Sequence, residues 1–70
     1  MEVTKEAKIA LVNRQLILVN NSYYSATIDV RVAESIGDEA MKKAGVEAMK
    51  KFEKMKDEYE KILKEIEAND

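Results

Sequence analysis

The residues best suited to binding chemistry lie in and around one short segment, Asn20-Asn21-Ser22-Tyr23-Tyr24-Ser25. Tyrosine, serine and asparagine on a turn form a compact recognition surface, because tyrosine gives rigid aromatic area and the others give adaptable hydrogen bonds. Arg14 and Arg31 could add an anion contact beside the Tyr23 ring, on which a nucleotide base could stack. The candidate residues for binding a partner or ligand are therefore Arg14, Asn21, Tyr23, Tyr24 and Arg31.

A second interpretation of this segment involves no binding. Asn20-Asn21-Ser22 would then be only a polar hairpin turn, with Tyr24 in the core and Tyr23 on the face of a sheet. Nothing at diagnostic spacing shows that the arginines and tyrosines converge. Gly37 and Gly45 are the only glycines, so the chain has no glycine-rich phosphate loop.

The chain contains no histidine and no cysteine. The commonest general base, the best thiol nucleophile and the usual ligands of zinc are therefore missing. Chemistry based on carboxylates alone would need a cleft that excludes water, which a chain of 70 residues rarely encloses. We expect a non-enzymatic protein that uses no cofactor and no metal.

Length and charge predict a single small domain, residues 1–70, with two unlike halves. Residues 1–37 hold four acidic and four basic side chains, whereas residues 38–70 hold ten acidic side chains and eight lysines. The net charge of −2 argues against a nucleic-acid partner. A chain this short buries only about 60% of its unfolded surface, so oligomerisation is the expected means of stabilisation.

The first half predicts an antiparallel sheet that presents the tyrosine segment. Residues 8–12 and 15–19 are apolar runs separated by two turn-tolerant residues, which suggests a hairpin. Residues 24–32 alternate strictly between apolar and polar side chains, as a strand with one buried face does. The expected arrangement is a three-stranded β-meander over about residues 6–33. A rival helix over residues 4–19 is disfavoured because residues 16–19 are apolar all round.

The second half predicts one long amphipathic α-helix over about residues 38–68, which makes the fold class α+β. Ser35 and Asp38 have the spacing of a capping box, although Asp38 could equally be the N-cap itself. Gly45 could mark a bend or a break. The apolar residues follow a heptad repeat through Met41, Gly45, Ala48, Phe52, Met55, Tyr59, Ile62 and Ile66, widened by Ala44, Met49 and Leu63.

The predicted helix is longer than the predicted sheet. About 31 residues of helix span roughly 46 Å, whereas a strand of nine residues spans about 30 Å. The end of the apolar stripe would then stay uncovered and join copies of the chain, packed on a sheet, an antiparallel helix or several helices. The expected oligomer interface consists of Phe52, Met55, Tyr59, Ile62, Leu63 and Ile66.

Residues 26–67 resemble a ribbon-helix-helix repressor. The resemblance takes residues 26–32 as the strand, residues 34–44 as a first helix and residues 47–67 as a second helix. In that family the paired strands enter the major groove, where Thr27, Asp29 and Arg31 would lie. Asp29 would face the negatively charged groove and residues before 20 have no counterpart, so a DNA-binding regulator is only an alternative.

The leading hypothesis is a small homo-oligomeric binding protein that works by occupying or sequestering a partner or ligand. In size and composition the chain is similar to accessory and host-inhibitor proteins of phages. The alternative from another class is a nucleotide-binding sponge that depends on Arg14, Tyr23 and Arg31. With no apolar run of about 20 residues and no cationic, apolar leader, we expect a cytoplasmic protein without membrane contact.

Overall fold

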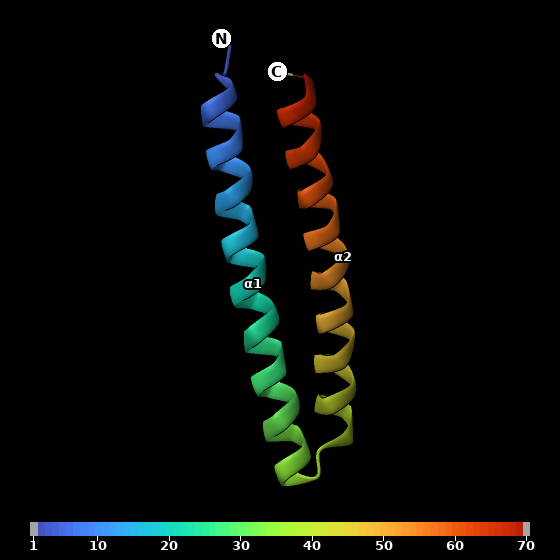
Figure 1. Cartoon of the computed structure of the whole chain (residues 1–70). Helices are drawn as coiled ribbons and strands as arrows, with labels where there is room; N and C mark the ends of the chain where they lie inside the picture. The colour runs from blue at the N-terminus through green and yellow to red at the C-terminus, as the bar shows by residue number, and fades with distance from the viewer. Residues whose placement is uncertain (1, 70) are drawn as a thin grey trace.

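The computed structural model describes residues 2–69 and consists of two long antiparallel α-helices (Figure 1). Helix α1 spans Lys5–Ile36 and helix α2 spans Glu39–Asn69. The chain reverses between them over two residues, so its two ends lie side by side at the opposite end of the hairpin (Figure 1). The Cα atoms occupy 51 × 16 × 14 Å, which makes the protein a narrow rod.

The predicted α+β fold with its β-meander is wrong, because residues 2–69 contain no strand. The three expected strands and the turn expected at Asn20-Asn21-Ser22 all lie within α1. The rival helix for residues 4–19 is the correct interpretation, and it continues to Ile36. The alternation over residues 24–32 misled because α1 is apolar on two sides. In such a helix the apolar residues fit the two-residue alternation of a strand as readily as the 3.6-residue period of a helix.

The side of α1 that packs on α2 follows a heptad repeat. Val12, Val19, Ala26 and Ala33 are buried and are spaced by seven residues. Ile9, Leu16, Tyr23 and Val30 lie beside them and are half-buried. A strict repeat of seven keeps one stripe facing a partner helix over many turns, so the hairpin is coiled-coil-like.

Helix α2 confirms the predicted helix over residues 38–68, and it runs through Gly45 without a break. The prediction that the last turns of this helix extend beyond the rest of the chain is wrong. Helix α1 has 32 residues and α2 has 31, so α1 is long enough to cover α2. An antiparallel helix, one of the three packing arrangements considered for the apolar stripe, is thus present in the same chain. Along α2, Met41, Ala48, Met49, Phe52, Met55, Tyr59, Leu63 and Ile66 are half-buried.

The starts of both helices are capped by side chains, and the end of α1 is closed by a glycine. The Ala7 N–H donates to Thr4 Oγ1 over 3.1 Å at the start of α1, and the Met41 N–H donates to Asp38 Oδ1 over 3.0 Å before α2. Asp38 is therefore the N-cap of α2. Gly37 ends α1 in the left-handed region, at φ 73°, and donates its N–H to the Ala33 carbonyl.

The helices approach each other most closely in the half of the hairpin next to the turn. Gly45 is buried there, and a Cβ atom added to it would lie 2.6 Å from Val30 Cγ2 and 3.5 Å from the Ala26 carbonyl oxygen. Ala26 and Ala33 are the small residues that α1 contributes to this region. Larger side chains, among them Leu16 and Phe52, fill the half nearer the chain ends.

Candidate interaction surface

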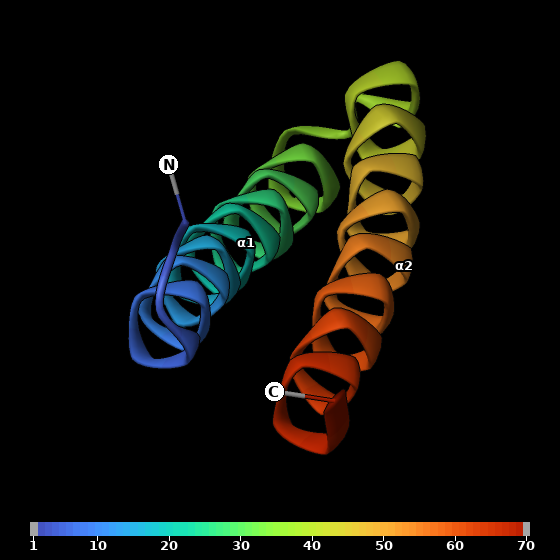
Figure 2. The same cartoon turned by 90° about the horizontal axis from the view of Figure 1, so that it is seen from above.

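The side of α1 that points away from α2 carries six large apolar residues, which we call the outer face. Their exposed fractions run from 44% at Val32 to 65% at Tyr24. Within residues 2–69 the helix α2 is the one element that packs on α1, and Figure 2 shows it on one side of α1. The outer face consists of Leu11, Ile17, Leu18, Tyr24, Ile28 and Val32.

The heptad repeat explains why these residues share a face. Leu11, Leu18 and Val32 occupy one heptad position, and Ile17 and Tyr24 occupy another. These positions, with that of Ile28, lie on the half of the helix opposite the buried stripe. Together they cover roughly 100° of the helix surface, which is the width of stripe that a helix normally buries against a core.

Charge is absent from the middle of α1. The fourteen residues 15–28 include no acid, lysine or arginine, and the uncharged stretch is bounded by Arg14 at one end and Asp29 at the other. Asn21 lies near its centre and is exposed. Six of the fourteen residues are polar but uncharged, and the apolar ones lie on two sides of the helix. An apolar side of a helix is normally covered by another element.

Helix α2 has the opposite character on its own outward side. That side is charged at every step of its heptad repeat, and each of these residues is exposed. Such a face is stable in water without a partner. The charged face of α2 consists of Lys43, Glu47, Lys50, Lys54, Asp57, Lys61 and Lys64.

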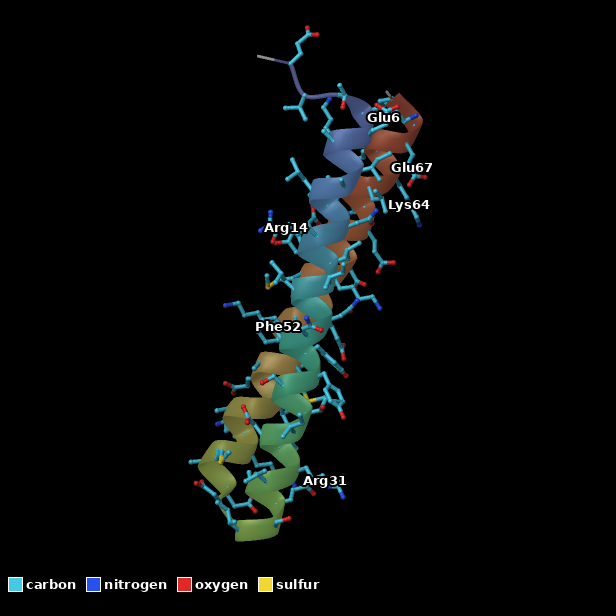
Figure 3. All side chains as sticks on the ribbon, turned by 90° about the vertical axis from the view of Figure 1, so that its left-hand side faces the viewer. Glu6, Arg14, Arg31, Phe52, Lys64 and Glu67 are labelled. Atoms are coloured by element: carbon cyan, nitrogen blue, oxygen red, sulfur yellow. The ribbon has the colours of Figure 1, made fainter. Side chains whose placement is uncertain are left out.

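The five predicted binding residues do not form one site within a single chain. Tyr23 faces α2, whereas Asn21 and Tyr24 are exposed on the outer side of α1. Arg14 and Arg31 are seventeen positions apart, about 25 Å along the helix, and Figure 3 shows them at separate heights on α1. A nucleotide could not contact both arginines and the Tyr23 ring in this arrangement. The strand required by the ribbon-helix-helix resemblance is also helical.

Tyr23 lies instead at a groove between the helices. Its hydroxyl donates to Glu53 Oε1 over 3.2 Å. Desolvation raises the pKa of Tyr23 above 10.0, and the hydrogen bond to Glu53 and the negative charge of that carboxylate raise it further. The groove has a volume of about 420 Å³ and is lined by Val19, Asn20, Tyr23, Phe52, Glu53, Lys56 and Asp57.

The six residues predicted as an oligomer interface lie along the contact between the two helices. Five of them are half-buried: Phe52, Met55, Tyr59, Leu63 and Ile66. Ile62 lies at the margin of the stripe and is 36% exposed. Since α1 already packs along these residues, the surface that still lacks a cover is the outer face of α1 instead.

Sequence reasoning missed five of the six residues of the outer face, since it proposed only Tyr24 for binding. The available signal was the pair of parallel repeats in residues 9–33. Val12, Val19, Ala26 and Ala33 recur every seven residues, and Leu11, Leu18 and Val32 hold three of the four corresponding places one position earlier, with Ser25 at the other. Two apolar repeats on one helix indicate two contact surfaces.

No protein-family model, no curated protein and no solved structure matches this chain. Among residues 2–69 there is no cluster of three or more acidic, histidine or cysteine side chains that could hold a metal ion. Neither helix, over the described residues, is long and apolar enough to cross a membrane. The candidate site is the outer face of α1, defined by its exposed apolar residues.

Proposed function

We propose that this chain is a small, non-enzymatic binding protein that works as a homo-oligomer, assembled through the outer face of α1. The observation that carries the proposal is the asymmetry of the hairpin. Helix α1 is apolar on two sides, whereas α2 is apolar only where it contacts α1. Self-assembly would cover the exposed side of α1 and leave the charged face of α2 free to occupy a partner.

The extent of the outer face supports a second copy as its occupant. A half-exposed side chain of this size presents on the order of 100 Å², so the six together can bury at most about 600 Å² per copy and about 1,200 Å² in a symmetric pair. Specific interfaces bury at least roughly 1,000 Å². The charged face of α2 does not suit this role, because its lysines and carboxylates would lose their hydration against Ile17 or Leu18.

The core of a single hairpin also favours assembly. The buried side chains of α1 are two valines and two alanines, and no large side chain in residues 2–69 is fully buried. A helix pair of this size gains little from such a core. A role as an accessory or inhibitor protein of a phage, and a cytoplasmic location, stay predictions from size and composition.

Sedimentation equilibrium of the full chain tests the proposal. We expect a dimer or a higher oligomer, and we expect Leu18→Glu to shift it to monomer because the new carboxylate would be buried in the interface. The matched control is Ala44→Glu, which adds the same charge at an exposed position of α2 and should leave assembly unchanged. A wild-type chain that stays monomeric at high concentration, with full helical content by circular dichroism, would rule the proposal out.

A further inference from the structure

We infer that two copies pair antiparallel through their outer faces, with Arg14 of each copy beside Asp29 of the other. This inference rests on the homo-oligomer proposed above and specifies its geometry. It would stack the helices in the order α2, α1, α1, α2, with both uncharged stretches at the centre and both charged faces of α2 outside. The turns of the two hairpins would then lie at opposite ends of the assembly.

The apolar residues of the outer face are distributed evenly about its midpoint. Leu11, Ile17 and Leu18 lie before Asn21, and Tyr24, Ile28 and Val32 lie after it. An antiparallel pair centred near Asn21 would set the first group of one copy against the second group of the other. Every large side chain of the face then gains an apolar neighbour.

Charge decides between the two possible directions. Arg14 and Asp29 are equally distant from the middle of the uncharged stretch and carry opposite charges. A parallel pair would place Arg14 against Arg14 and, since Arg31 shares the heptad position of Ile17 and Tyr24 on the outer face, Arg31 against Arg31, which is repulsive at both ends. An antiparallel pair brings each Arg14 within about one helical turn of both Asp29 and Arg31 in the other copy, so each Arg14 gains an acidic neighbour that its side chain can reach and that a parallel pair does not supply.

Both charged residues are available for such a contact. Arg14 and Asp29 are exposed, and within residues 2–69 neither forms an ion pair. They are fifteen positions apart on one helix, about 22 Å, so they cannot meet within a single chain. Any energetic coupling between them must therefore act between copies.

Asn21 is suited to fix the register of the pair. It is the polar residue nearest the centre of the outer face, and in an antiparallel pair the two copies of Asn21 would approach each other across the symmetry axis. A side-chain amide both donates and accepts hydrogen bonds, so two asparagines can satisfy each other. A single polar residue within an apolar helix contact is a known means of fixing register.

Cysteine cross-linking tests the direction of the pair, because the chain has no cysteine of its own. We expect Leu11→Cys mixed with Val32→Cys to form a disulfide-linked dimer, while neither variant links to itself. Asn21→Cys should link to itself. Lys54→Cys, on the charged face of α2, is the control for random collision. If Leu11→Cys and Val32→Cys each link efficiently to themselves, the pair is parallel and the inference is overturned.

A charge exchange tests the contact between Arg14 and Asp29. We expect Asp29→Arg to weaken dimerisation about tenfold, since it adds a third basic side chain beside Arg14 and Arg31 at both ends of the interface. Arg14→Glu should weaken it less, since the new carboxylate repels Asp29 but attracts Arg31. The double variant should regain affinity close to that of the wild type. An equimolar mixture of the two single variants should do the same by forming a heterodimer. A double variant and a mixture that are both as weak as the single variants would overturn the assigned contact.

These experiments separate this inference from the proposal on which it rests. If the chain never self-associates, both the homo-oligomer and its antiparallel arrangement are ruled out. A chain that dimerises through the outer face, as shown by loss of the dimer in Leu18→Glu, but gives the parallel pattern of cross-links removes only the antiparallel arrangement. Antiparallel cross-links together with rescue by charge exchange support both.

Discussion

At the scale of single residues, the distance between the helices depends on Gly45. The residue is buried against Val30 and the carbonyl oxygen of Ala26. A glycine within a helix is usually costly, by about 1 kcal/mol relative to alanine. Here that loss is offset because a larger residue would push the helices apart along the turn-proximal half of the hairpin.

We predict that Gly45→Ala destabilises the protein by about 1 kcal/mol, because overpacking costs roughly 1–3 kcal/mol and exceeds the gain in helix propensity. The added methyl group would lie 2.6 Å from Val30 Cγ2. The control is the same change in a Val30→Ala background, where that atom is absent. There Gly45→Ala should become stabilising. Urea denaturation of the four proteins gives the comparison, and equal effects in both backgrounds would contradict the assigned contact.

Tyr23 gives a prediction for pH. Its pKa is raised above 10.0 by desolvation first, and then by the hydrogen bond and the charge of Glu53. A raised pKa in the folded state means that folding favours the neutral phenol. This contribution to stability is fully present below pH 10.0 and is lost as the pH rises through the pKa of the folded state.

We expect Glu53→Gln to lower the pKa of Tyr23, because the variant removes the carboxylate charge. Alkaline titration of phenolate absorbance in a Tyr24→Phe, Tyr59→Phe background isolates this group. Asp57→Gln, one turn further along α2, is the control and should leave the titration nearly unchanged. If Glu53→Gln and wild type titrate alike, the hydrogen bond between Tyr23 and Glu53 does not form in solution.

At the scale of elements, the two-residue turn depends on its caps. Gly37 adopts φ 73°, and nothing lies within 4 Å of the position of an added Cβ. Any effect of substitution there arises from the backbone alone. Gly37→Ala should therefore cost about 1 kcal/mol, while Gly37→Asn should cost less because asparagine tolerates left-handed geometry. Thermal denaturation measures both, and Ser35→Ala, an exposed neighbour in α1, is the reference.

The two helices differ in how far the sequence could predict them. In α2, charged residues lie on one side and apolar residues on the other, and this pattern fits a helix but not a strand. The predicted bounds of α2 were therefore correct to within one residue. For α1, Leu16, Ile17, Leu18 and Val19 place apolar side chains in all directions. Local sequence cannot distinguish a strand buried on both faces from a helix covered on both sides.

The candidate site was only partly predictable for the same reason. Tyr24 and Asn21 were identified from their residue types, and both are exposed on α1. Ile17 and Ile28 could not be recognised as surface residues while they were assigned to strands of a core. Their exposure follows only once α2 is known to cover the opposite side of α1, which is a property of the tertiary structure.

At the scale of the whole molecule, the two helices of the hairpin enclose little buried apolar surface. Its buried core is small and its largest exposed apolar surface lies on α1. Folding and assembly are therefore expected to be linked, because a partner that binds only the folded chain raises its stability by mass action.

We predict that the melting temperature rises with protein concentration for the wild-type chain. Leu18→Glu should abolish this dependence, because the folded monomer would then melt without dissociation. Ala44→Glu should keep it. Circular dichroism melts over a hundredfold range of concentration would show the effect, and identical curves for wild type and Leu18→Glu would contradict linkage through the outer face.

The position of the chain ends also determines how the hairpin responds to force. Both ends lie at the same end of the rod, where Lys5 Nζ donates to the Glu67 carbonyl oxygen over 3.4 Å (Figure 1). A load applied between the ends would open the helices in sequence, like a zipper, and would not slide one past the other. Contacts of Tyr59 and Phe52 would part early, and the close contact at Gly45 would part last. The protein should therefore yield gradually at low force.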